Sequence, residues 1–287
     1  MTRLDVKKTY KLYIGGAFPR SESGHTLQVN THKDEHLANV AQASRKDARD
    51  AVVAARGAQR GWAGATSYNR GQVLYRIAEM LEGRREQFVE DIRACEGVSQ
   101  RQASSQVDQA IDAWVWYAGW ADKYAQLVGN ANPVAGPYFN LSVPEPTGVV
   151  AAFAPAEAKN TSLLGLVRTV APIVVSGNAV VVWTHPRQPI PAMTFAEVLH
   201  TSDVPAGVVN ILTGLRESAA PWLASHADVG ALDLMGATDV DWAALEAEAS
   251  ATLKRVLTPA KSVGEESLAR IRAFTEMKTI WHTKALG

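Results

Sequence analysis

The spacing of apolar residues predicts three short strands and then a helical segment in the first half of the chain. Turn-bounded apolar runs predict the strands, at Tyr10–Ile14, Thr26–Val29 and His36–Ala43. Apolar residues at helical spacing predict the helices, at Arg45–Trp62, Asn69–Arg84, Gln87–Glu96 and Ser104–Val128. Aromatic residues widen the apolar stripe of the last helix, which leaves open whether it packs on its own sheet or also against another subunit.

From Gly148 onward, nearly continuous apolar runs alternate with helical patterns. The predicted strands are Gly148–Pro155, Ala179–Trp183, Gly207–Leu212, Val229–Leu234 and Lys254–Leu257. The predicted helices between them are Leu163–Val175, Ile190–His200, Ser218–Ser225 and Trp242–Leu253. Continuous apolar strands separated by helices are typical of a parallel sheet that is covered on both faces. We therefore expect an α/β fold with a doubly wound, Rossmann-like parallel sheet.

Four stretches lie outside this alternation. Gly129–Pro137 is rich in Gly, Asn and Pro and predicts a loop, and Tyr138–Val143 alternates like a strand that the two following prolines kink. Thr258–Glu266 is polar and predicts a linker. The segment after it predicts a short amphipathic helix at Ser267–Met277 and a final strand at Lys278–His282.

Composition excludes several classes of function. Lys and Arg balance Asp and Glu at 29 residues each, so there is no basic field and nucleic acid is not an expected partner. The first residues lack the apolar core of a signal peptide, and no apolar run reaches the roughly 18 residues of a membrane span. We expect a cytoplasmic protein. A single cysteine, Cys95, rules out an internal disulfide, and the 7 histidines are scattered without metal-ligand spacing.

Seven sequence segments, in this order, resemble the aldehyde dehydrogenase superfamily. They are LYIGGAF with SESG at 12–24, AVVAARGAQRGW at 51–62, RGQVLYRIAEMLEGRREQF at 70–88, EPTGVVAAFAP at 145–155, SGNAVVVW at 176–183, VPAGVVNILTG at 204–214 and RIRAFTEMKTIWH at 270–282. The chain looks most like the truncated second module of the two-module, class-sixteen enzymes. The resemblance implies a nucleotide-binding domain at 1–257, a linker at 258–266 in place of the catalytic domain, and a C-terminal helix and oligomerisation strand at 267–287.

The resemblance also implies which catalytic groups are missing. Family enzymes attack the aldehyde with a cysteine thiolate and use a glutamate as general base, and both groups lie in the segment that the linker replaces. Cys95 lies near the end of a predicted helix beside Glu96, whose charge raises a thiol pKa, so we interpret it as structural. Asn160 aligns with the family's oxyanion asparagine if three residues are inserted after Pro155, but we favour a helix N-cap. We expect no catalytic residue.

The cofactor motif of the family is only partly retained. Gly236 and Thr238 match the Gly-Ser-Thr turn that faces the cofactor phosphates, and they are the candidate cofactor-binding residues. Asp241 replaces the closing glycine of that motif, and Trp183 replaces the lysine that holds the adenosine ribose. Asp239 and Asp241 suit the first turn of a helix instead. We expect no cofactor, although NAD(P) binding is left open.

The family further implies an oligomerisation flap, formed by Tyr138–Val143 and the final strand. The candidate interface residues are Tyr138, Leu141, Val143, Thr279, Ile280 and Trp281. Our leading hypothesis is a non-catalytic subunit that assembles with a full-length, catalytic NAD(P)-dependent aldehyde dehydrogenase, or with itself, and supports or regulates it. The alternatives are a nucleotide- or metabolite-binding regulator, and an oxidoreductase acting on aldehydes by displaced chemistry.

Overall fold

A five-stranded parallel sheet organises the chain. The computed structural model describes residues 6–155, 162–184, 187–259 and 265–284. The strands are β6 (Val149–Phe153), β7 (Ala179–Trp183), β8 (Val209–Leu212), β9 (Val229–Asp233) and β10 (Arg255–Leu257). Their spatial order is β10-β9-β6-β7-β8, with every neighbouring pair parallel. The chain thus winds outward from β6 to β8 and then returns to β9, which confirms the doubly wound fold.

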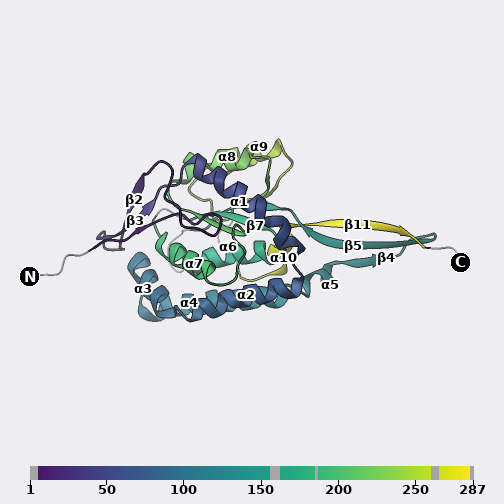
Figure 1. The fold of residues 1–287 in the computed structure, drawn as a ribbon, viewed down its shortest axis with the longest axis horizontal. Helices are drawn as coiled ribbons and strands as arrows, with labels where there is room; N and C mark the ends of the chain where they lie inside the picture. The colour runs from purple at the N-terminus through teal and green to yellow at the C-terminus, as the bar shows by residue number, and fades with distance from the viewer. Residues whose placement is uncertain (1–5, 156–161, 185–186, 260–264, 285–287) are drawn as a thin grey trace, which may run out of the picture.

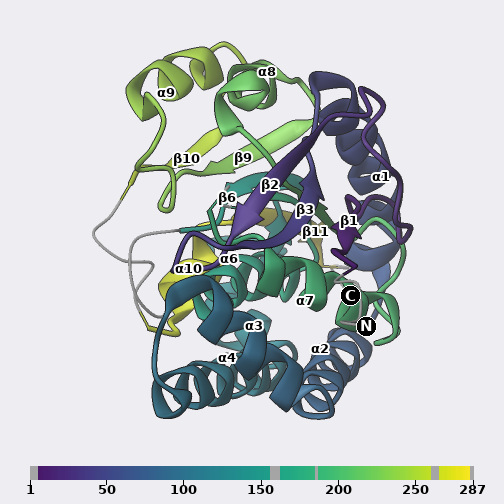
Figure 2. The ribbon, with the colours of Figure 1, turned by 90° about the vertical axis from the view of Figure 1, so that its left-hand side faces the viewer.

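Helices cover both faces of this sheet (Figure 1, Figure 2). The helices on one face are α1 (Arg45–Gly64), α8 (Ala220–Ser225) and α9 (Trp242–Ser250). Those on the other face are α2 (Ser67–Glu82), α3 (Arg85–Glu96), α4 (Gln100–Trp120), α6 (Leu164–Val174), α7 (Ile190–His200) and α10 (Leu268–Arg272). Alternate residues of β6 pack into the two cores, Val149 and Ala151 on the α1 side and Val150 and Ala152 on the α6 side. Burial on both sides explains why β6 is apolar at every position.

A second, small sheet precedes α1. It consists of β1 (Thr9–Tyr10), β2 (Thr26–Asn30) and β3 (His36–Ala41), with β3 in the centre. The first strand is shorter than the predicted Tyr10–Ile14, because the chain leaves β3 after Tyr10. Tyr13 instead forms a β-bridge with Ile211 of the main sheet, in which the Ile211 amide donates to the Tyr13 carbonyl at 2.7 Å.

A three-stranded antiparallel sheet projects from the body of the molecule, and we call it the flap (Figure 1). Its strands, in the order β11-β5-β4, are β4 (Asn130–Asn132), β5 (Tyr138–Pro146) and β11 (Thr275–Thr283). Three predictions were wrong in part. β4 lies inside the predicted loop, β5 runs on through both prolines, and β11 begins where the last helix was expected to continue, since α10 ends at Arg272.

The predicted helix at Ser104–Val128 is also divided. α4 begins earlier, because Ser99 and Gln102 form a capping box, and ends at Trp120; a separate turn, α5 (Tyr124–Val128), follows. At Ala121 the amide bonds to the carbonyl of Ala118, three residues back, which is the tighter geometry of a helix end. Within the described ranges, none of the helices has the length and apolarity needed to cross a bilayer.

Candidate functional site

The carboxyl ends of β6, β7 and β9 meet at the switch point of the sheet, where doubly wound folds bind their ligands. An arginine, Arg216, lies across these strand ends. It belongs to η1 (Arg216–Ser218), a short 3-10 turn between β8 and α8, and only 1% of it is exposed. Nothing in the sequence around it, Leu215-Arg216-Glu217, distinguishes it from a solvated charge, and sequence reasoning missed it.

Each of the five N–H groups of this guanidinium has an acceptor. The acceptors are the carbonyls of Thr184 (3.3 Å from Nε), Gly236 (3.0 Å from Nη1), Trp183 (3.4 Å from Nη2) and Ala154 (bonded to Nη2), and the Asp239 carboxylate (2.7 Å from Nη1). Burial lowers the pKa of Arg216, and the charge of Asp239 partly opposes that shift. The side chain ties together the ends of three strands.

The candidate cofactor residues have different surroundings. At Gly236, a Cβ atom would lie 2.3 Å from the carbonyl oxygen of Phe153, so the close approach of two backbone segments requires glycine here. Thr238 is exposed. Asp241 is the N-cap of α9, one residue before the first turn in which it was expected, and its carboxylate accepts the amide of Ala244 at 3.1 Å. The prediction that Asp239 lies in the first turn of this helix was wrong, because α9 begins only at Trp242 and the Asp239 carboxylate accepts from Arg216 instead.

Trp183 is a core residue rather than a surface of a ligand site. It is fully buried among apolar residues on the α1 side of the sheet. Its indole N–H donates to the carbonyl of Gly214 at 2.9 Å. The indole therefore holds the loop that carries Arg216, and it presents no donor that could reach a ribose hydroxyl.

Cys95 lies on α3 and packs against Val29, Val40 and Ile190, with 6% of its surface exposed. Burial raises the pKa of its thiol to about 12, with further contributions from the charges of Asp91 and Glu96. The thiol is therefore protonated at neutral pH and is a poor nucleophile. This geometry supports the structural role predicted for Cys95.

The N-terminus of α6 has a cap that the sequence did not indicate. Asn160 lies outside the described residues, so its role stays a prediction. Gln106 of α4, 1% exposed, accepts the amides of Leu163 and Leu164 at 3.0 and 3.3 Å. Its amide group in turn donates to Glu96 at 3.1 Å.

Among all residues that the structure describes, no cluster of three or more His, Cys, Asp or Glu side chains could hold a metal ion.

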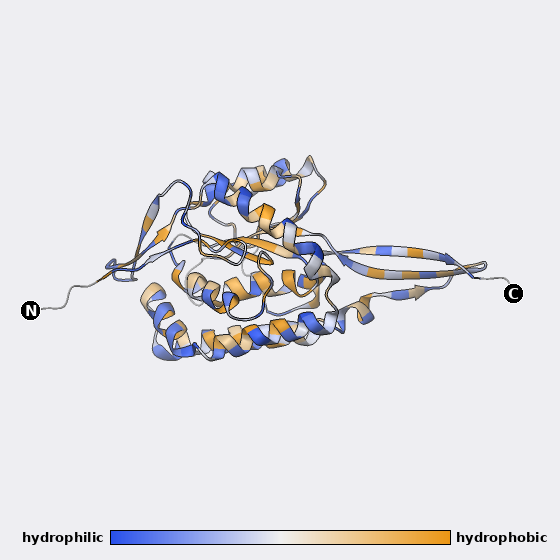
Figure 3. Ribbon diagram, in the orientation of Figure 1, coloured by the Kyte–Doolittle hydropathy of each residue, from blue (hydrophilic) through white to orange (hydrophobic). Residues whose placement is uncertain are grey.

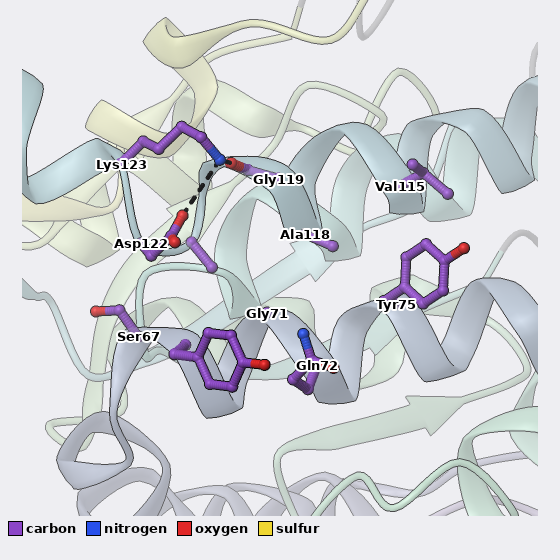
Figure 4. A pocket seen from close by; sticks show the side chains of 11 residues that line it. Ser67, Gly71, Gln72, Tyr75, Val115, Ala118, Gly119, Asp122 and Lys123 are labelled. Atoms are coloured by element: carbon purple, nitrogen blue, oxygen red, sulfur yellow. Dashed lines mark hydrogen bonds and ion pairs between the residues drawn. The ribbon is translucent and has the colours of Figure 1, made fainter.

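The aromatic stripe of α4 packs inward. Trp114 is fully buried and stacks on Phe195 of α7 at 5.8 Å. On the outer side, α2 and α4 enclose a shallow hollow between Tyr75, Gly119 and Lys123 (Figure 4). This hollow lies in the outer helical layer, away from the strand ends.

The outer edge of the flap, formed by β11, has no strand beside it in the ranges that the structure describes. Two backbone hydrogen bonds fix its pairing pattern, Thr147 N to Phe274 O at 3.2 Å and Lys284 N to Pro137 O at 2.7 Å. Along antiparallel strands, hydrogen-bonded pairs of residues alternate with non-hydrogen-bonded pairs. Starting from Phe274, the backbone N–H and C=O groups of every second residue therefore point toward β5. The amides of the residues in between point away from β5; they belong to Thr275, Met277, Thr279, Trp281 and Thr283.

The register of β5 and β11 places the candidate interface residues on both faces of the flap. Apolar and polar residues alternate along these strands (Figure 3). The rings of Tyr138 and Trp281 meet edge to face at 5.8 Å on one face, and 59% of Trp281 is exposed. Leu141 lies opposite Ile280 on the other face. An exposed aromatic on a sheet without a core of its own is typical of an interaction surface.

Comparisons with known proteins agree with this fold. Residues 18–260 match the sequence profile described as the aldehyde dehydrogenase family. Aldehyde dehydrogenase, cytosolic 1, from Elephantulus edwardii is 33% identical over 262 residues, covering 89% of this chain and 51% of that protein. The mitochondrial aldehyde dehydrogenase of Rattus norvegicus is 32% identical, covering 79% of this chain and 44% of that protein.

Solved structures show the same architecture. An NAD-dependent aldehyde dehydrogenase from Sinorhizobium meliloti matches with a TM-score of 0.78 at 26% identity, over 88% of this chain and 50% of that one. Betaine aldehyde dehydrogenase from Staphylococcus aureus, crystallised with NAD+, matches with a TM-score of 0.79 at 21% identity, over 86% and 49%. The chain belongs to the aldehyde dehydrogenase family and spans about half the length of the relatives it matches.

Proposed function

We propose that this chain is a non-catalytic, aldehyde-dehydrogenase-like subunit. In this proposal it assembles through its flap with a complete, catalytic NAD(P)-dependent aldehyde dehydrogenase and supports or regulates that enzyme. The observation that carries the proposal is the free edge of β11, a nine-residue strand whose outward amides have no strand beside them among the residues described.

The edge of β11 favours strand addition. An exposed strand edge pairs readily with another strand, and backbone hydrogen bonds supply the affinity. Two of the five outward residues of β11 have large apolar or aromatic side chains, Met277 at 51% exposure and Trp281 at 59%, and the other three are threonines. Family resemblance indicates the partner, since the final strand of the family joins the catalytic-domain sheet of a neighbouring subunit.

The available side chains argue against chemistry in this chain itself. Its only cysteine, Cys95, is buried with a pKa of about 12, far from the reactive range of a catalytic thiol. We therefore assign any aldehyde oxidation to the partner.

Co-expression with a complete aldehyde dehydrogenase from the same organism tests the proposal. We expect the two chains to co-elute from size exclusion and to give a defined hetero-oligomeric mass by light scattering. The proposal is wrong if the purified chain remains a monomer or homodimer with every complete aldehyde dehydrogenase offered.

A matched pair of variants tests the role of the β11 edge. Thr279→Pro removes an outward amide without removing a backbone hydrogen bond to β5, although it also loses the Thr279 hydroxyl, which lies 3.0 Å from the hydroxyl of Ser142 in β5. We expect the hetero-oligomer to be weakened by at least tenfold in Kd. Thr279→Val loses the same hydroxyl but keeps the amide, and it should bind like the wild type. Equal binding by both variants would show that the assembly uses another surface.

A further inference from the structure

We propose that Arg216 fills the cofactor crevice from within: its guanidinium substitutes for a ligand at the ends of β6, β7 and β9, so this domain binds no nicotinamide nucleotide there. The inference concerns the crevice and not the flap. It therefore holds or fails independently of the proposed assembly.

Hydrogen-bond saturation is the first argument. Four backbone carbonyls and one carboxylate accept the five N–H groups of Arg216, so none remains for a phosphate oxygen. A phosphate-binding arginine presents a free fork of donors to its anion. Arg216 instead presents its fork to the protein backbone.

Space and charge provide the second argument. Arg216 is 1% exposed, and its guanidinium lies 5.7 Å from the ring centroid of Phe153. Asp239, with 33% of its side chain exposed, neutralises the cation from the solvent side. A pyrophosphate entering the crevice would have to displace the guanidinium and would meet the Asp239 carboxylate, a like charge.

The loop that delivers Arg216 is itself held in place. Gly214 has φ +111°, a conformation that side chains other than glycine rarely adopt, and its carbonyl accepts the indole N–H of Trp183. Trp183 thus fixes the turn from which Arg216 reaches back over the strand ends. Trp183 therefore orients the loop, and Arg216 closes the crevice.

The first test measures nucleotide binding by the wild-type chain. A site with a Kd of about 10 µM would raise Tm by several degrees at millimolar NAD+ or NADP+. We expect no shift above about 0.5 °C with either nucleotide, and no heat of binding by titration calorimetry. Saturable binding of either nucleotide to the wild-type chain would overturn the inference.

The second test measures what Arg216 contributes to the fold. Arg216→Ala removes the five donors that Arg216 supplies to four carbonyls and Asp239, so we expect Tm to fall by about 5 °C or more. The control, Arg49→Ala, removes a guanidinium whose side chain is 54% exposed and should change Tm by less than about 1 °C. An equal fall in Tm for the two variants would mean that Arg216 does not hold the strand ends together, and it would contradict the inference.

A third variant covers the case in which Arg216→Ala does not fold. Arg216→Lys keeps the charge but has three donors rather than five, so it should fold with a smaller loss of Tm, and Asp239→Asn should do the same. If both variants match the wild type in Tm, Arg216 does not hold the strand ends together and the inference fails.

Discussion

At the scale of single residues, three side chains near the carboxyl ends of the strands have structural tasks in this chain. Trp183 anchors the carbonyl of Gly214, Arg216 joins three strand ends, and Asp241 caps α9. Each of these contacts lies within the described protein and needs no ligand. The strand ends are thus stabilised by side chains.

Another residue-scale feature, Asp91 on α3, makes stability depend on pH. Burial raises the pKa of Asp91 from 3.8 to about 6, although a hydrogen bond from Thr194 at 2.6 Å partly opposes the shift. Between about pH 4 and 6 the folded chain keeps a proton that the unfolded chain has lost, so stability falls as pH rises through this window. Above pH 6 the loss reaches up to about 3 kcal/mol, at 1.36 kcal/mol per pKa unit.

The variant Asp91→Asn is therefore expected to be more stable than the wild type at pH 7 and equally stable near pH 4. Denaturant unfolding at several pH values measures this difference. Asp50→Asn, which alters a carboxylate that is 49% exposed, should show no such pH-dependent gain. A gain of equal size at pH 4 and pH 7 would mean that ionisation of Asp91 is not its cause.

The sequence predicts some of these residue roles and not others. Asp241 was placed to within one residue of its position at the start of α9, and burial supports the structural interpretation of Cys95, because helix starts and an acidic neighbour are local in sequence. Arg216 and Gln106 were missed, since their acceptors and donors come from segments far apart along the chain. When segments that are distant along the chain bury a charged or polar side chain, the sequence around that residue carries no pattern that predicts it.

At the scale of elements, apolar spacing predicted every strand of the main sheet and most of the helices. The errors lie in the flap and beside it. β4 and the start of β11 are stabilised by pairing with β5 and not by a local apolar pattern. Asn130–Asn132 carries no strand signal of its own, and its partner is eight or more residues away.

The C-terminal helix is attached to the main sheet by a buried ion pair. Arg270 of α10 donates to Asp233 of β9 at 2.6 Å, with 8% and 1% of their side chains exposed. Ile271 and Phe274 beside it are fully buried. These contacts fix the chain where it returns from the linker, and so they position β11 in the flap.

Removing one member of this pair should be costly. Asp233→Asn leaves the Arg270 charge uncompensated, and we expect the free energy of unfolding to fall by about 3–5 kcal/mol in urea unfolding. The double variant Asp233→Asn/Arg270→Met should recover part of this loss. Glu276→Gln breaks an exposed pair with Arg255 and should cost below about 1 kcal/mol. Equal losses from the buried and exposed changes would show that the pair does not anchor α10.

At the scale of the whole molecule, the protein combines a closed body with an open flap. The two cores of the sheet are filled, and the strand ends are tied by Arg216. The flap projects from this body (Figure 1). Most residues of β11 are exposed, and its outer edge has no strand beside it within the described part of the chain. The surface most suited to a partner is therefore the flap.

The most direct measurement of the central claim is amide hydrogen exchange of β11, with and without a complete aldehyde dehydrogenase. We predict that the outward amides of Met277, Thr279 and Trp281 become protected by at least tenfold in the mixture, because a partner strand would bond to them. The amides that already face β5 should change less. Unchanged exchange at all three outward amides, with the partner in excess, would contradict the account.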